Sequence, residues 1–155
     1  MPTSDGFHPD FDSKTTEVTR NRVRHVKASD ITSDTAQSDG MRRFAALSGR
    51  SVGTEKLWMG ETHVSPGAAS ANHHHGEAET AIYVRSGNPD FVFHVQGVQG
   101  VQEVRISAGP GDYIFVPPYL PHREENPDPN TPAEVVIARS TQEAIVVNLP
   151  ALYPL

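Results

Sequence analysis

The sequence predicts an all-β fold, because short apolar runs alternate with turn-forming residues along most of the chain. Thirteen prolines and twelve glycines interrupt its 155 residues, and only 7% of the residues are aromatic. Short strands at near-regular spacing, separated by such turns, are typical of a sandwich or a barrel. The length fits a single domain with a hydrophobic core of its own.

The expected strands begin after a polar N-terminal segment. Residues 1–21 are rich in Ser, Thr, Asp and Pro, so we expect a flexible N-terminal arm there and a single barrel domain over residues 22–155. Residues 97–100 are expected to form a hairpin loop, and the β-branched end of 77–84 argues against a helix. We expect strands at 23–28, 41–47, 55–64, 80–85, 91–96, 103–106, 113–116, 134–138 and 144–147.

Composition and charge exclude several classes of partner. The formal net charge is −6 and the 13 basic residues are scattered, whereas nucleic-acid binders concentrate basic residues on one face. We therefore expect neither nucleic acid nor a membrane as a partner. No apolar run approaches the roughly 18 residues of a membrane span. The polar N-terminus lacks a signal-peptide core, which favours a cytoplasmic protein, and the absence of Cys removes disulfides and thiolate ligands.

Three consecutive histidines give the strongest chemical signal in the sequence. Side chains alternate along a strand, so His73 and His75 share one face and His74 takes the other. Glu79 follows closely and offers a carboxylate, while His122 stands among prolines that fix its backbone. On residue types alone, a metal site and a solvated surface patch both remain open.

The spacing around these residues resembles the two motifs of the cupin superfamily. The first motif consists of Gly67, His73, His75, Glu79 and Gly87, separated by five, one, three and seven residues. The second motif consists of Gly111, Pro117, Tyr119, His122 and Asn126, separated by five, one, two and three residues. The resemblance extends over about residues 22–149 and is closest to small single-domain cupins of the cupin 2 type.

This resemblance implies a double-stranded β-helix, the cupin jelly-roll barrel, with one metal ion in its mouth. The ligands that it implies are His73, His75, Glu79 and His122. Three imidazoles and one carboxylate suit a divalent transition metal, which we expect to be Fe, Mn, Co, Ni, Cu or Zn.

Two departures from the family pattern concern the fourth ligand and one turn. Seven residues separate Glu79 from Gly87, where the family commonly has six between these two motif positions. Counting back from Gly87 therefore places Thr80 at the ligand position. A bulge near 79–80 would turn Glu79 toward the metal, and we favour Glu79 because a dication gains from an anionic ligand. Otherwise the site has three histidines and water. Tyr119 replaces the family's usual Gly, which leaves the turn geometry open because φ > 0 is uncommon for Tyr.

The remaining histidines carry weaker signals. His63 precedes a Pro-Gly turn near the expected barrel mouth, and His94 lies in an alternating strand. We favour a structural role for both, while a contribution of His63 or His74 to the site stays open.

The segment that starts at His73 also resembles bacterial single-domain cupins, some of which act in polyketide ring closure. That resemblance implies an enzyme acting on a small oxygenated compound. The metal would either polarise a carbonyl for isomerisation or cyclisation, or bring substrate and O₂ together for oxygenation. The alternative is a non-catalytic cupin that binds a metal or small ligand. The family also implies a homodimer, with the arm or the strand at 22–28 available to pair across subunits.

Overall fold

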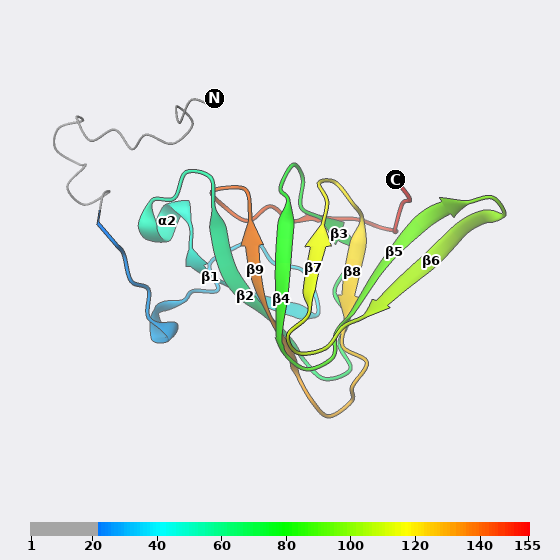
Figure 1. Ribbon diagram of the computed structural model, residues 1–155, viewed down its shortest axis with the longest axis horizontal. Coiled ribbons are helices and arrows are strands. Elements are labelled where there is room, and N and C mark those ends of the chain that lie inside the picture. The colour runs from blue at the N-terminus through cyan, green and yellow to red at the C-terminus, as the bar shows by residue number, and fades with distance from the viewer. Residues whose placement is uncertain (1–21) are drawn as a thin grey trace, which may run out of the picture.

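Within residues 22–155, which the computed structural model describes, ten strands form two antiparallel five-stranded sheets (Figure 1). The arm expected over residues 1–21 lies outside the described residues. The first sheet has the order β1-β2-β9-β4-β7, with β1 (Met41–Leu47), β2 (Trp58–Val64), β9 (Ala133–Arg139), β4 (Thr80–Ser86) and β7 (Tyr113–Val116). The second has the order β10-β3-β8-β5-β6, with β10 (Val147–Asn148), β3 (His73–His74), β8 (His122–Glu125), β5 (Asp90–Gly97) and β6 (Gly100–Ser107).

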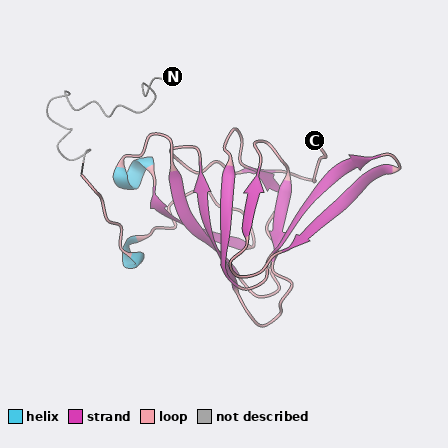
Figure 2. Ribbon diagram, viewed as in Figure 1, coloured by secondary structure: helices cyan, strands magenta, loops and turns pink. Residues whose placement is uncertain are grey.

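The prediction of an all-β fold is confirmed. Strands dominate Figure 2, and helix in the described residues is limited to the 3-10 turn η2 (Ala28–Asp30) and the short helix α2 (Gly49–Val52). Two antiparallel sheets in which most neighbouring strands, such as β2 and β9, are distant in sequence agree with a jelly-roll barrel. Neither of the described helices has the length and apolar character needed to cross a membrane.

Most of the expected strands are present, with small differences at their ends. The strands expected at 41–47 and 113–116 coincide with β1 and β7. The loop expected at 97–100 is the tight connection of the β5–β6 hairpin, where Gly97 pairs with Gly100. Pattern and turn chemistry therefore located the first sheet and this hairpin well.

Two expected strands are wrong and one strand was missed. Residues 22–27 have no regular structure, and Val23 is fully exposed. The alternation of apolar and polar residues in this segment therefore does not correspond to a buried face. The strand expected over 144–147 is reduced to the two residues of β10. The sequence of β8, from His122 to Glu125, contains no apolar residue, so no hydrophobic alternation marked it as a strand.

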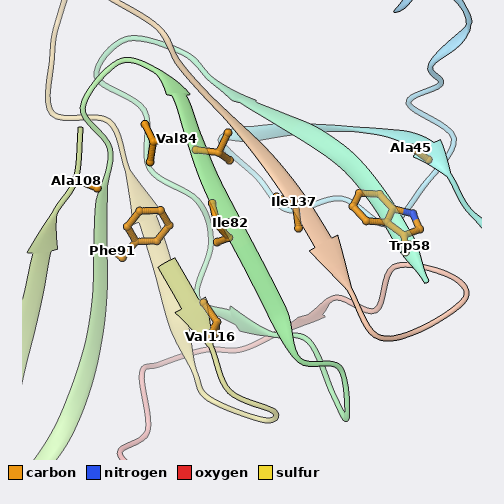
Figure 3. Packing of buried hydrophobic residues seen from close by; sticks show 9 residues of the cluster. Ala45, Trp58, Ile82, Val84, Phe91, Ala108, Val116 and Ile137 are labelled. Carbon is orange, nitrogen blue, oxygen red and sulfur yellow. The ribbon is translucent and has the colours of Figure 1, made fainter. Parts of the chain in front are cut away.

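Alternation along the first sheet builds the hydrophobic core. Every second residue is buried along β2 and β9, and the same holds for most of β4. Trp58, at the start of β2, has the largest fully buried side chain. Burial of one large apolar side chain stabilises the fold by roughly 1.5–3 kcal/mol. The core cluster shown in Figure 3 consists of Ala45, Trp58, Ile82, Val84, Phe91, Ala108, Val116, Val135 and Ile137.

Two residues of the sequence motifs serve backbone geometry. Gly87 has φ +78°, and a Cβ atom there would lie 2.6 Å from the Cα of Ala133, so only glycine fits. Asn126 is buried and its Nδ2 donates to the carbonyl oxygens of Val64 and Thr131, at 3.3 and 2.8 Å. Both residues fix turns of the barrel.

Candidate metal centre

Two neighbouring strands of the second sheet bring three histidines together. His73 begins β3, His75 is the first residue after that strand, and His122 begins β8. His73 and His122 pair directly across the ladder. All three are at most 2% exposed, whereas His74 between them is half-buried. The predicted alternation of the histidine run is therefore confirmed.

The three imidazoles form a compact group inside the barrel. Their ring centroids lie 4.5 to 5.0 Å apart. One nitrogen from each ring lies within 4.8 Å of the others, which makes this the one metal-ligand cluster of the described residues. Because metal–imidazole bonds measure about 2.0–2.1 Å, a small movement of the side chains brings all three nitrogens onto one ion.

Backbone carbonyls orient each ring. The Nδ1–H group donates to a carbonyl oxygen at 2.7 Å for His73 and at 2.9 Å for both His75 and His122. A carbonyl oxygen only accepts, so each Nδ1 carries the hydrogen and each Nε2 keeps its lone pair. Metal-binding histidines are typically held by such a contact. The three carbonyls belong to Ala71, Ile145 and Leu120, respectively.

The surroundings keep the rings neutral. Burial lowers the pKa of His73 to about 2 and that of His122 to about 4, and it holds the pKa of His75 far below its usual range. The positive charges of Arg43 and Arg139 act in the same direction. Neutral imidazole is the form that binds a metal.

The donor set fits a divalent metal ion. The Nε2 atom of His122 is buried and has no hydrogen-bond partner in the described part of the chain. A buried polar atom without a partner is costly, and a metal ion would satisfy it. His73, His75 and His122 therefore agree with the predicted ligand set.

Glu79 does not join the histidines, and its prediction as a ligand is corrected here. Its side chain is exposed, and its backbone N–H donates to the Oγ of Ser140 at 2.9 Å. Thr80 is fully buried instead. The register between β4 and β9 shifts between Val84 and Ser86, so the irregularity lies at the far end of β4. The strand is regular where it passes the site, and the alternative with three histidines and no carboxylate describes the structure.

The other histidines have structural surroundings, as favoured from the sequence. His63 lies 3.4 Å from Glu61, and His94 lies 3.7 Å from Glu103. The Nδ1 of His74 accepts from the backbone N–H of Gly76 at 2.9 Å. None of the three belongs to the metal-ligand cluster.

Tyr119 adopts a left-handed backbone conformation, which glycine tolerates better than any other residue. Its φ is +61°, and it is the one described non-glycine residue with positive φ. The turn before His122 therefore holds a bulky residue in a left-handed conformation, which is costly for a residue with a Cβ atom.

Three buried charged residues near the histidines were not predicted from the sequence. Arg43 on β1, Arg139 at the end of β9 and Glu124 on β8 are 0%, 2% and 2% exposed. The Nη2 of Arg43 lies 3.3 Å from the Nε2 of His73, and the Nη2 of Arg139 lies 3.4 Å from the Nε2 of His75. Two cations therefore face the nitrogens that would bind a metal.

Burial also shifts the pKa values of these charged groups. It lowers the pKa of Arg139 to about 9, with the neighbouring Arg43 acting in the same direction and Glu124 opposing both. Burial lowers the pKa of Arg43 and raises that of Glu124. Strand alternation could have found Arg43, which shares the inward face of β1 with buried Met41 and Ala45.

The model of the Cupin domain family matches residues 60–139, just over half of the chain. The chain belongs to the cupin family. The matched segment runs from β2 to the end of β9 and contains the three histidines, so this cupin carries its candidate metal centre within the family's core.

Solved structures that resemble this cupin share its fold at low identity. The polyketide cyclase RemF from Streptomyces resistomycificus is 21% identical with a TM-score of 0.63, over 84% of this chain and 87% of RemF. A recombinant oxalate oxidase in complex with glycolate is 21% identical with a TM-score of 0.62, over 76% of this chain and 59% of the oxidase.

A third similar structure is the oxalate decarboxylase from Bacillus subtilis. It is 19% identical with a TM-score of 0.61, over 75% of this chain and 29% of the decarboxylase. This cupin thus matches less than a third of the decarboxylase, for which another structure describes Mn(II) centres. At such identities these similarities show the fold alone. No curated protein sequence matches the chain.

Proposed function

We propose that this cupin is a divalent-metal-dependent enzyme that acts on a small oxygenated compound. The observation that carries the proposal is the set of three buried, neutral imidazoles whose Nε2 lone pairs converge inside the barrel. A barrel interior with few exposed atoms excludes bulk water, which strengthens electrostatic interactions with a bound substrate.

The chain's own residues would divide the work. His73, His75 and His122 hold the metal, which when bound supplies a Lewis acid or a centre where substrate and O₂ meet. The buried hydroxyls of Thr62 and Thr80 have no hydrogen-bond partner in the described residues, and the two residues pair across the first sheet with Arg43 and Arg139, respectively. With three protein ligands in place of four, more coordination positions stay open for substrate or water.

Two reaction classes agree with this arrangement. The likeness to the polyketide cyclase RemF supports Lewis-acid isomerisation or cyclisation, and the likeness to oxalate oxidase supports O₂-dependent oxidative chemistry, including a dioxygenase reaction. Fe, Mn, Co, Ni, Cu and Zn all accept imidazole ligands. The Mn(II) centres of the decarboxylase support Mn as one of these candidates.

The second candidate function is a cupin that binds a metal or small ligand without catalysis. The contacts of Arg43 and Arg139 with the histidine nitrogens favour the form of this candidate that binds a small ligand, because two cations beside the ligand nitrogens weaken the binding of a bare dication. The two candidates differ in whether the loaded protein turns over a substrate.

The test uses untagged protein loaded under anaerobic conditions with each candidate metal. A panel of small diketones, hydroxyaromatics and hydroxy acids is incubated with and without O₂ and analysed by mass spectrometry. We expect product only with metal, loss of product with a chelator, and loss in His122→Gln.

The matched control is Glu79→Gln, which alters an exposed carboxylate next to the site and should retain activity. Turnover without O₂ would rule out the oxygenase. Stoichiometric metal without turnover of any compound in the panel would favour the binding protein.

We further propose a homodimer and a cytoplasmic location, without nucleic acid or membrane as a partner. Because residues 22–27 form no strand, the exposed apolar side chains of Tyr83, Tyr113 and Phe115 on β4 and β7 are the better support for a second copy. Light scattering at micromolar concentration should give twice the mass of the chain, and Phe115→Ser should reduce it; a monomeric wild type would contradict the dimer.

A further inference from the structure

Two buried arginines face the histidines and lack acceptors for most of their N–H groups. Arg43 and Arg139 project from the first sheet and are 0% and 2% exposed. The Nε and Nη1 atoms of both are buried without a hydrogen-bond partner among residues 22–155. A guanidinium group in this state favours any acceptor that reaches it, above all an anionic one.

The buried charges around the histidines do not balance. Glu124 is the buried carboxylate that opposes the two arginines. Asp90, the other buried carboxylate of the described residues, is bound by Arg105 at 2.9 Å. One positive charge is therefore in excess, and a divalent ion on the histidines adds two more. Buried charges are normally paired, so the loaded site calls for an anion.

Metal binding also removes the acceptors that the arginines now use. The Nη2 of Arg43 lies 3.3 Å from the Nε2 of His73, and the Nη2 of Arg139 lies 3.4 Å from the Nε2 of His75. Each of these Nε2 atoms has one lone pair. That lone pair either accepts a hydrogen bond or binds a metal. Once a metal takes it, both guanidinium groups need a new acceptor in the same place, and the Sδ of Met41, 3.6 Å from Arg43, is a weak one.

The guanidinium of Arg139 is held in place for such a ligand. Its Cζ lies 5.1 Å from the ring centroid of Trp58, which is itself fully buried. A cation–π contact with a buried indole favours one position of the guanidinium, whose fork of N–H groups matches a carboxylate. A donor oriented in advance loses little entropy when it binds.

We propose that the site takes a small carboxylate anion, whose oxygens accept hydrogen bonds from Arg43 and Arg139 beside the metal on the histidines. This inference rests on the proposed function and names its substrate class. It couples the two ligands, because the anion reduces the repulsion between metal and arginines, and the metal adds attraction for the anion. By linkage, each ligand then tightens the binding of the other.

The test measures Co²⁺ binding to the untagged chain by calorimetry at constant ionic strength, with acetate or with its neutral isostere acetamide. We expect acetate to tighten Co²⁺ binding at least about fivefold and acetamide to leave it unchanged. Arg43→Met and Arg139→Met should each reduce the acetate effect to less than about twofold. Apolar replacements of buried charges often fold well, and Arg43→Lys, which keeps the charge, should retain part of the effect.

The matched control is Arg42→Met, because Arg42 neighbours Arg43 on β1 but is exposed. This variant should keep the full acetate effect. Equal Co²⁺ affinity in acetate and in acetamide would overturn the inference. An acetate effect that persists in both Arg43→Met and Arg139→Met would also overturn it.

A titration of acetate onto the metal-free protein, followed by thermal unfolding, separates this inference from the proposed function. Stabilisation by acetate that depends on Arg43 and Arg139, in a protein that binds no metal, would support the anion site and contradict the metal-dependent enzyme. Absence of an arginine-dependent acetate effect from both the loaded and the metal-free protein would contradict the anion site.

Discussion

The inner faces of the two sheets differ in chemistry. The first sheet supplies most of the apolar core, together with the two arginines. The second sheet supplies the three histidines and Glu124. The faces meet at the site, where the arginine Nη2 atoms lie 3.3 and 3.4 Å from histidine Nε2 atoms. The first sheet therefore carries most of the stability, and the second carries the metal ligands.

The largest expected effect is an acid sensitivity that belongs to the histidine face. His73, His75 and His122 have folded-state pKa values below the usual 6.5, so below that pH the unfolded chain binds protons that the folded chain does not. The free energy of unfolding of the metal-free protein should be independent of these groups above pH 6.5. It should fall toward pH 4 by about 1.4 kcal/mol per pH unit for each histidine.

Urea unfolding at pH 7.5, 6.0, 5.0 and 4.5 measures this dependence. Glu124, whose pKa is raised, offsets part of the slope. His122→Gln should remove the contribution of one histidine from the slope. A flat profile between pH 6.5 and 4.5 would contradict three neutral buried rings.

The next effect concerns the apolar face. Ile137→Ala removes a fully buried side chain of the core cluster and should cost roughly 2–5 kcal/mol of unfolding free energy. Denaturant unfolding at pH 7.5 measures the loss, and the exposed Val101→Ala should change stability by less than about 0.5 kcal/mol. If Ile137→Ala were as mild as Val101→Ala, the core would not lie on this sheet.

A smaller loss should follow from Glu124→Gln, which removes the buried negative charge between the faces. The arginines would then have no buried counter-charge, and the cost should be about 3 kcal/mol, because removing one of several opposite buried charges leaves the others uncompensated. Urea unfolding checks this value. In a double-mutant cycle, Arg43→Met should recover part of the loss; strict additivity of the two changes would show that these charges do not interact.

The smallest effect is expected at the turn before His122. Tyr119→Gly removes roughly 1–2 kcal/mol of strain that the left-handed conformation imposes on the folded state. It also increases the conformational entropy of the unfolded chain, which stabilises that chain by about 0.4–1 kcal/mol. The net gain in unfolding free energy should stay below about 1 kcal/mol, with metal content unchanged. A clear loss of stability would mean that the Tyr119 side chain, near His74, contributes to packing.

The contrast between the faces also explains what could be predicted from the sequence. Apolar alternation located β1, β4 and β9 because their inward residues are mostly aliphatic. The same criterion failed at β8, whose inward residues are His122 and Glu124. Apolar alternation identifies strands whose inward side chains are part of the hydrophobic core. It does not identify a strand whose inward side chains are polar or charged.

The ligand set shows the same limit. The spacing of His73, His75 and His122 was sufficient, because strand alternation and two motifs fixed their faces. Glu79 was expected beside the histidines and lies apart from them, because the position of the extra residue within β4 depends on its pairing with β9, which sequence spacing does not contain. Arg43 was overlooked because a charged residue in an apolar alternation is usually taken as exposed.

The most direct test of the central claim is the metal content of the untagged protein, measured by elemental analysis after loading and desalting. We predict close to one divalent ion per chain in the wild type and in Glu79→Gln, and loss of the ion in His122→Gln. Wild-type protein that retains no metal, or a Glu79→Gln variant that loses it as His122→Gln does, would contradict a centre built on His73, His75 and His122.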